Sequence, residues 1–352
     1  MSSPLAAVAR AMVAPGKGIL AADESTGTAN KRFAPLNIPQ TEEMRGRYRE
    51  MLFTAPRFGE FVSGVILYDE TIRQTGPSGK SLEAVIAQSG AFPGIKLDTG
   101  THPLALAGPD EKITEGLDGL AKRVEEYVKL GAKFAKWRAV IAIDDGIPTQ
   151  RAIVANAHAL ARYAAICQAG GLVPIVEPEV LIDGEHSKHS LERSFEVHES
   201  VLATVFDELA IAGVKFEEMV LKPSMVAPGQ KSGQKASVNE VADATVTVLL
   251  RWVPAAVAGI AFLSGGQGDE EATEHLNEIN VIGKQRRAPW PLTFSYGRAL
   301  QHSAMIAWMG SEANLAKAQA QLTHRLHMNS LASLGQYTAE SEKERELVGS
   351  TG

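Results

Sequence analysis

Ionisable side chains interrupt several short apolar segments of this chain, and some of them stand two residues apart. Lys136 and Arg138 lie in "FAKWRAVI", Glu177 and Glu179 lie in "LVPIVEPE", and Lys222 lies in "EMVLKP". In a strand, side chains two positions apart point to the same face. Burial of an isolated charge is costly, so these groups must be paired, hydrated or used in chemistry.

A lysine pair in one pocket indicates carbonyl chemistry. Lys136 and Lys222 are expected to lower each other's pKa, because like charge and desolvation both favour the neutral amine. A neutral amine attacks a carbonyl and forms a Schiff base, which accepts electrons when an adjacent C–C bond breaks. Glu177 and Asp23, the latter in "GILAAD", are expected to transfer protons, with pKa values pushed apart by their surroundings.

Two glycine-containing turns predict a phosphate site. Ser264 and Gly265 lie in "FLSGGQGDEE", where backbone N–H groups and the following helix favour an anion. Arg298 follows the turn "FSYG" and offers a forked donor for phosphate. Lys96 and Arg138 add cations for a second phosphate, so the substrate is expected to carry phosphate at both ends.

The run "LSGGQ" also occurs in transporter-type ATPases, which need an upstream loop of the form G-x-x-x-x-G-K-[ST]. The nearest candidate, "QTGPSGKS", has Gln74 where the first glycine must stand. No apolar strand ending in an acidic residue follows "LSGGQ" either. The sequence therefore favours a phosphate-binding turn over an ATPase motif.

Eight apolar runs bounded by turn residues alternate with helical patterns, which predicts parallel strands joined by helices. We expect an α/β fold, an eight-stranded parallel (β/α)8 or TIM barrel, in one domain over residues 1–337, with a mobile tail over residues 338–352. Barrel active sites lie at the C-terminal strand ends, where the ionisable residues fall. Outward charges or a structural ion-pair network are the alternative, disfavoured because every such strand carries its charges at one end. The strands are expected over residues 18–23, 63–69, 93–98, 134–141, 172–178, 218–223, 259–265 and 291–297.

Composition limits the possible partners and compartments. The 352 residues carry a net charge of −6, with 45% hydrophobic and 22% charged residues and no basic block, which disfavours nucleic acid and anionic membranes. The single Cys167 cannot form an internal disulfide, which fits a reducing compartment. The N-terminus is too broken by Pro and Arg for a secretory signal, and Arg251 and Pro254 interrupt the longest apolar run. We expect a cytoplasmic protein.

Seven motifs, in order between about residue 16 and residue 337, resemble the Schiff-base (class I) fructose-bisphosphate aldolases. They are "GILAADEST", "GIKLD", "FAKWR", "VPIVEPE", "VLKPSM", "FLSGGQ" and "LTFSYGRALQ". The resemblance implies reversible cleavage of fructose 1,6-bisphosphate to dihydroxyacetone phosphate and glyceraldehyde 3-phosphate. It also implies a sugar-phosphate substrate, no cofactor, no metal and a homotetramer.

By resemblance, Lys222 forms the Schiff base and Glu177 transfers protons during dehydration and cleavage. Asp23 acts on the hydroxyl of the breaking bond with help from Lys136, and Glu179 orients the lysines. The expected substrate-binding residues are Ser264, Gly265, Gly297 and Arg298 at the phosphate next to the ketone, and Ser25, Lys96 and Arg138 at the distal phosphate.

The chain departs from the family pattern at two places. Eukaryotic members end in a tyrosine that helps protonate the enamine, whereas the last tyrosine here is Tyr337. Thr99 stands where the family usually has a lysine after "KVD". The first difference bears on proton transfer, and the second alters local charge.

Three rival functions are less well supported. A metal-dependent aldolase would need clustered histidines, and His186, His189 and His198 lack a recognisable ligand spacing. A phosphosugar isomerase would not need the lysine pair. A binding protein that kept the fold without its chemistry would not need all four catalytic candidates.

Overall fold

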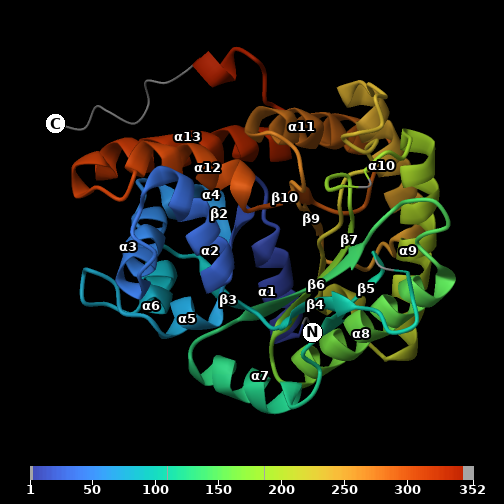
Figure 1. Cartoon of the computed structure of the whole chain (residues 1–352), viewed down its shortest axis with the longest axis horizontal. Coiled ribbons are helices and arrows are strands. Elements are labelled where there is room, and N and C mark those ends of the chain that lie inside the picture. The colour runs from blue at the N-terminus through green and yellow to red at the C-terminus, as the bar shows by residue number, and fades with distance from the viewer. Residues whose placement is uncertain (1–2, 109, 186, 344–352) are drawn as a thin grey trace.

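The computed structural model describes residues 3–108, 110–185 and 187–343. Eight parallel strands close into a barrel in the order β1-β10-β9-β8-β7-β6-β3-β2, with helices around it (Figure 1). The predicted eight-stranded barrel is confirmed, and each predicted segment overlaps one of its strands, with boundaries that differ by up to two residues where a strand extends beyond its segment. These strands are β1 (Gly18–Ala22), β2 (Val62–Leu67), β3 (Phe92–Lys96), β6 (Phe134–Ile141), β7 (Val173–Val180), β8 (Val220–Leu221), β9 (Ile260–Phe262) and β10 (Leu292–Tyr296).

Helices connect the strands and cover the outside of the barrel, where they share one continuous apolar cluster with the strands' outer faces. Many of these helices begin at a Ser or Thr whose side chain accepts a hydrogen bond from a backbone N–H of the first turn. At α10, Ser237 and Glu240 form a reciprocal capping box. The helices are α1 (Pro4–Met12), α2 (Thr26–Phe33), α3 (Glu42–Phe53), α4 (Phe58–Phe61), α5 (Asp69–Arg73), α6 (Leu82–Gln88), α7 (Leu120–Lys129), α8 (Gln150–Ala169), α9 (Leu191–Ile211), α10 (Val238–Trp252), α11 (Asp269–Gln285), α12 (Arg298–Trp308) and α13 (Leu315–Ser333).

A second apolar cluster fills the inside of the barrel. It contains inward side chains from the lower parts of the strands, among them Ile19, Phe134 and Ile175, and Met12 of α1 packs against them. In Figure 1, α1 lies within the ring of helices. The N-terminal end of the barrel is therefore closed by packed apolar side chains.

The same alternation that fills the barrel also builds its mouth. Two residues beyond Phe134 and Ile175 the inward positions are Lys136 and Glu177. The strand register places Lys96 opposite Lys136 and Arg138 opposite Glu177. Strand periodicity thus brings apolar residues to one end of the barrel and charged residues to the other.

A two-stranded antiparallel sheet follows β3 and was not predicted. It consists of β4 (Gly100–Pro103) and β5 (Lys112–Glu115). The hydroxyl of Thr114 in β5 donates to the backbone carbonyl of Arg138 at 2.7 Å, so the hairpin is attached to the barrel beside the charged residues. The alternation in "KITE" after a Gly-Pro turn is the signal that could have identified it.

Residues 338–343, the start of the expected C-terminal tail, are described, and Ser341–Lys343 form a 3-10 turn. Residues 344–352, the rest of that tail, lie outside the described residues. No helix in the described part of the chain has both the length and the apolar character needed to cross a bilayer.

The packing of Phe134 inside the barrel predicts that Gly94 cannot carry a side chain. A Cβ at Gly94 would lie 2.3 Å from the ring of Phe134, which is fully buried. We expect Gly94→Ala to lower the free energy of unfolding in urea by about 1–3 kcal/mol. Gly27→Ala in α2, where a Cβ meets nothing within 4 Å, is the matched control and should not destabilise. Equal stabilities for the two variants would contradict this account of the core.

Candidate active site

A cavity of about 700 Å³ opens at the C-terminal ends of the barrel strands. Seven acidic and seven basic side chains line it, so its formal charge is balanced. All twelve site residues expected from the sequence lie on its wall. The structure therefore brings together residues from seven different strand ends.

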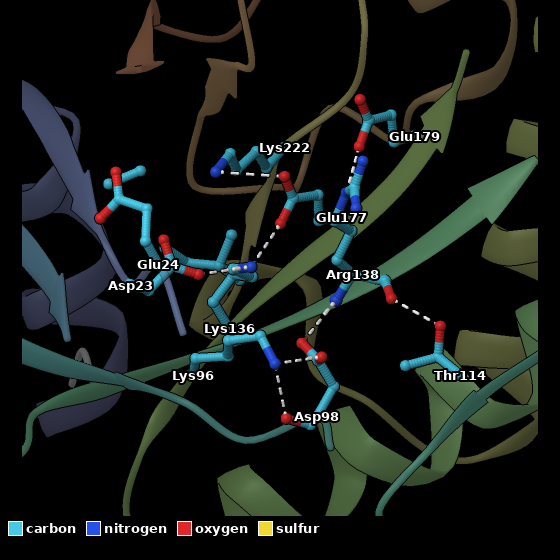
Figure 2. Close-up of polar contacts among 12 residues, drawn as sticks. Asp23, Glu24, Lys96, Asp98, Thr114, Lys136, Arg138, Glu177, Glu179 and Lys222 are labelled. Carbon is cyan, nitrogen blue, oxygen red and sulfur yellow. Dashed lines mark hydrogen bonds and ion pairs between the residues drawn. The ribbon is translucent and has the colours of Figure 1, made fainter. Parts of the chain in front are cut away.

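At the centre, one carboxylate contacts two lysines (Figure 2). Glu177 Oε1 lies 3.1 Å from Lys222 Nζ, and Glu177 Oε2 lies 3.2 Å from Lys136 Nζ. Asp23, directly after β1, places Oδ2 2.7 Å from the Lys136 amine. The side chains of both lysines and of Glu177 are 4% exposed. Lys136 thus has two carboxylate partners and Lys222 has one.

The expectation that the two lysines lower each other's pKa is wrong for Lys136. Burial by itself lowers the pKa of this amine, but the charges of Asp23 and Glu177 outweigh burial and hold the pKa above its ordinary value. Lys136 is therefore a fixed positive charge at neutral pH. The sequence placed the two lysines on the fourth and sixth strands but did not show that the Glu177 carboxylate, on the strand between them, contacts both.

Nor are the pKa values of the two central carboxyl groups pushed apart as expected. Burial would raise both, but Lys136 and Lys222 outweigh it, so the pKa values of Asp23 and Glu177 both lie below their ordinary values. In the free protein both groups are ionised at neutral pH. Neither group therefore carries a proton in the free protein, and a proton that either one donates must first be taken up.

A second charged group adjoins the first and includes Glu179. The carboxylate of Glu179 pairs with the Arg138 guanidinium, so the expected role of Glu179 in orienting the lysines does not match its contacts; Glu177 contacts both lysines. Lys96 Nζ lies 2.5 Å from Asp98 Oδ1 and donates to the Asp98 carbonyl at 2.8 Å. Lys96 and Arg138, expected at the distal phosphate, each already hold a carboxylate.

The turns after β9 and β10 form the opposite wall. Ser264 and Gly265 precede α11, Gly297 precedes α12, and two helix N-termini therefore border the cavity. A Cβ at Gly265 would lie 2.7 Å from Leu263, which explains the glycine. Arg298 donates to the neutral carbonyl of Gln267 at 3.2 Å, so its charge can turn to an anion without losing an ion pair.

Glu24, next to Asp23, was not predicted as part of the site. Its carboxylate lies 2.5 Å from Arg32 and 2.6 Å from Arg49, and its side chain is 8% exposed. Ser25 caps α2 by accepting from the Thr28 N–H at 3.3 Å. A carboxylate beside a catalytic candidate was visible in "AADEST", but its arginine partners lie in helices that only the fold brings near.

The two described histidines among those considered as metal ligands do not line this cavity. His189 and His198 are buried and neither lines the cavity wall, and His186 lies outside the described residues. His198 Nδ1 lies 2.7 Å from the Ser194 carbonyl. Residues 3–108, 110–185 and 187–343 contain no group of three or more His, Cys, Asp or Glu arranged to hold a metal ion.

Comparisons with known proteins agree along nearly the whole chain. The family model "Fructose-bisphosphate aldolase class-I" matches residues 4–349. A Xanthomonas campestris protein named "Probable fructose-bisphosphate aldolase class 1" is 52% identical over 334 residues, which cover 95% of this chain and 98% of the relative. The Caenorhabditis elegans protein "Fructose-bisphosphate aldolase 2" is 51% identical over 95% of this chain and 89% of its own length.

A solved structure shares both fold and sequence with this chain. It is fructose-bisphosphate aldolase from Plasmodium falciparum, in a complex with TRAP and a small-molecule inhibitor. The TM-score is 0.92 at 47% sequence identity, and 95% of each chain is covered.

The charge balance at the centre of the site predicts a pH-dependent effect of Lys136→Met. Removal of this amine leaves two buried carboxylates poorly compensated, so the free energy of unfolding at pH 7 should fall by about 3–5 kcal/mol. Because the folded-state pKa values of both carboxyl groups are lowered, their stabilising contribution is present above their ordinary pKa values of 3.8 and 4.5 and is lost as the pH falls. The difference from the original protein should therefore shrink below about pH 4.5.

Urea unfolding from pH 7 down to about pH 3, which includes the range below the ordinary carboxyl pKa values, measures this difference. Lys122→Met on the exposed side of α7 is the control and should change little at any pH. A loss of stability in Lys136→Met that stays constant with pH would show that packing, rather than charge balance, is what Lys136 contributes.

Proposed function

The chain belongs to the class I fructose-bisphosphate aldolase family, and on that premise we propose that its barrel site cleaves fructose 1,6-bisphosphate reversibly through a Schiff base on Lys222. The observation that carries the proposal is the Glu177 carboxylate between two buried lysines, only one of which has a second carboxylate partner. Lys136 is held as a cation by its two carboxylates, and Lys222 is assigned as the nucleophile. The products are dihydroxyacetone phosphate and glyceraldehyde 3-phosphate.

Schiff-base formation needs a proton to move at each stage. The Lys222 amine attacks the ketone carbon and gives a carbinolamine, whose hydroxyl must leave as water. Glu177, 3.1 Å from Lys222 Nζ, is within reach to pass a proton from the attacking amine to the ketone oxygen, and then to deliver a second proton, taken up from solvent, to the departing hydroxyl. The result is a protonated imine with Glu177 again ionised.

Cleavage then breaks the bond between the third and fourth sugar carbons. Asp23 takes the proton of the hydroxyl on the fourth carbon, the aldehyde forms, and the bonding electrons pass to the protonated imine to give an enamine. The Lys136 cation, 2.7 Å from Asp23, keeps Asp23 ionised before this step and stabilises negative charge on the oxygen during it. Asp23 is thus the proposed base and Lys136 its electrostatic partner.

The two phosphate groups are assigned to opposite walls. Ser264, Gly265, Gly297 and Arg298 would hold the phosphate next to the ketone, supported by two helix N-termini and by an Arg298 side chain whose described partner is a carbonyl. Ser25, Lys96 and Arg138 would face the distal phosphate. Because Lys96 and Arg138 pair with carboxylates, the distal phosphate must compete with Asp98 and Glu179 for them.

The enamine must be protonated to release dihydroxyacetone phosphate. Residues 338–352 contain no tyrosine. We assign this proton to Glu177 or to a water beside it, since Glu177 receives protons earlier in the same cycle. The tail over residues 338–352 then supplies no catalytic acid, and residues 1–337 form the catalytic domain.

The remaining features of the proposal concern the setting of the enzyme. We propose that the chain works in the cytoplasm, without metal or cofactor, as a homotetramer. The single cysteine and the absence of a spanning helix from the described residues support the compartment. Light scattering of the purified protein measures the oligomeric state, and a monomer would contradict the tetramer.

Trapping identifies the nucleophile. Borohydride added with dihydroxyacetone phosphate should reduce the imine and fix one triose phosphate on Lys222, located by peptide mass spectrometry; with fructose 1,6-bisphosphate the adduct on Lys222 is the hexose bisphosphate or the triose phosphate. Lys222→Arg should abolish both the adduct and cleavage, because the guanidinium stays protonated. Chelators should leave activity unchanged; loss with EDTA and recovery with a divalent metal would overturn the Schiff-base proposal.

Arg298→Ala tests the phosphate wall. It removes a charged, forked donor whose hydrogen bonds contribute about 1.5–3 kcal/mol each. Binding of dihydroxyacetone phosphate, measured by calorimetry, should weaken about 10- to 150-fold. Arg286→Ala at the far end of α11, where the guanidinium pairs with Asp243, is the control and should bind normally. Equal affinities for the two variants would place the phosphate elsewhere.

A further inference from the structure

The start of the C-terminal segment is attached to the barrel by one carboxylate. Glu342 Oε1 lies 2.5 Å from Arg325 Nη1 and accepts from the Tyr337 hydroxyl at 3.0 Å, while Glu342 Oε2 lies 2.9 Å from His324 Nε2. The Glu342 side chain is 16% exposed. Hydrogen bonds from these groups hold the pKa of Glu342 down at about 2, although burial acts in the opposite direction.

The guanidinium of Arg325 contacts α11 as well as the Glu342 carboxylate, and α11 is the helix that follows the turn Ser264–Gly268. Its Nη2 donates to the backbone carbonyl of Asp269 at 3.1 Å and to the hydroxyl of Thr273 at 2.5 Å. Asp269 is the first residue of α11, directly after the turn that contains Ser264 and Gly265. Arg325, which is 4% exposed, therefore connects residues 338–343 to the first turn of α11.

This arrangement requires an anion at Glu342. A buried guanidinium next to a helix N-terminus is opposed by the positive end of the helix dipole, so it is stable there only with a compensating carboxylate. Among the described contacts of Arg325, Glu342 supplies the negative charge. Without it, Arg325 must turn to water or to another acidic group, and its contacts with Asp269 and Thr273 would be lost.

We propose that Glu342 and Arg325 are positioning residues for the phosphate next to the ketone: Glu342 neutralises Arg325, and Arg325 fixes the start of α11 and with it the turn Ser264–Gly268. The inference rests on the proposed function, because it concerns the same phosphate wall. It gives the C-terminal segment a role in substrate affinity in place of proton donation. Figure 1 shows the segment leaving α13 and passing beside α11.

The test uses the full-length chain with Glu342→Gln, which keeps the size of the side chain and removes its charge. In the condensation direction, the KM for dihydroxyacetone phosphate should rise about 3- to 10-fold, while the KM for glyceraldehyde 3-phosphate and kcat stay within about twofold. Glu340→Gln is the matched control, since Glu340 is 77% exposed in the same segment and pairs with Lys343 at 3.6 Å. It should behave like the original protein.

Arg325→Lys distinguishes the ion pair between residue 325 and Glu342 from the hydrogen bonds between residue 325 and α11. Lysine keeps a positive charge for Glu342, but its single nitrogen cannot replace a fork that contacts both the carboxylate and the Asp269 carbonyl. The same rise in KM is therefore expected although the segment remains attached. An unchanged KM in Arg325→Lys, or a loss of kcat with no change in KM in either variant, would overturn the proposal.

Hydrogen exchange gives a readout that does not depend on turnover. Amides of residues 264–273 should exchange faster in Glu342→Gln and Arg325→Lys than in Glu340→Gln. Equal exchange in all three would overturn the positioning role. If the original protein failed to cleave fructose 1,6-bisphosphate at all, the proposed function would fail, and the exchange experiment would still decide whether Glu342 orders the phosphate turn.

Discussion

The rest of the site depends on the balance of charge around Glu177. Its carboxylate, inside the barrel mouth, contacts the amines of Lys136 and Lys222, and Asp23 adds a second negative charge on the Lys136 side. Each of these charges alone would be too costly to bury, so they are stable only together. The two lysines differ in their surroundings, because Lys136 contacts two carboxylates and Lys222 contacts one among the described residues.

Ordinary strand alternation is enough to position Lys136 and Glu177 inside the barrel mouth. Inward positions on β6 and β7 run from Phe134 and Ile175 in the apolar interior to Lys136 and Glu177 above them. The packed lower layer, closed by α1, keeps water out from below and fixes the backbone from which the charged side chains rise. Stability and chemistry are therefore separated along the barrel axis, as is general for this architecture.

The two walls of the cavity are built differently, and this bears on how a bisphosphate would be held. On one wall, turns and helix starts present backbone N–H groups, and Arg298 contacts only a neutral carbonyl among its described partners. On the other wall, Lys96 and Arg138 are held by Asp98 and Glu179. The first wall therefore offers a cation whose described partner is neutral, whereas the cations of the second wall are already paired with carboxylates.

The sequence by itself determined the barrel, its eight strand segments and twelve of the residues that line the cavity, because strand periodicity and motif order are local properties. It did not determine the pKa direction of Lys136, the partner of Glu179, the hairpin of β4 and β5, or the contact from Glu342 through Arg325 to Asp269. Those features depend on which charges meet across elements distant in the chain. Electrostatic energy changes steeply with separation and burial, so only the tertiary structure, which fixes both, could decide them.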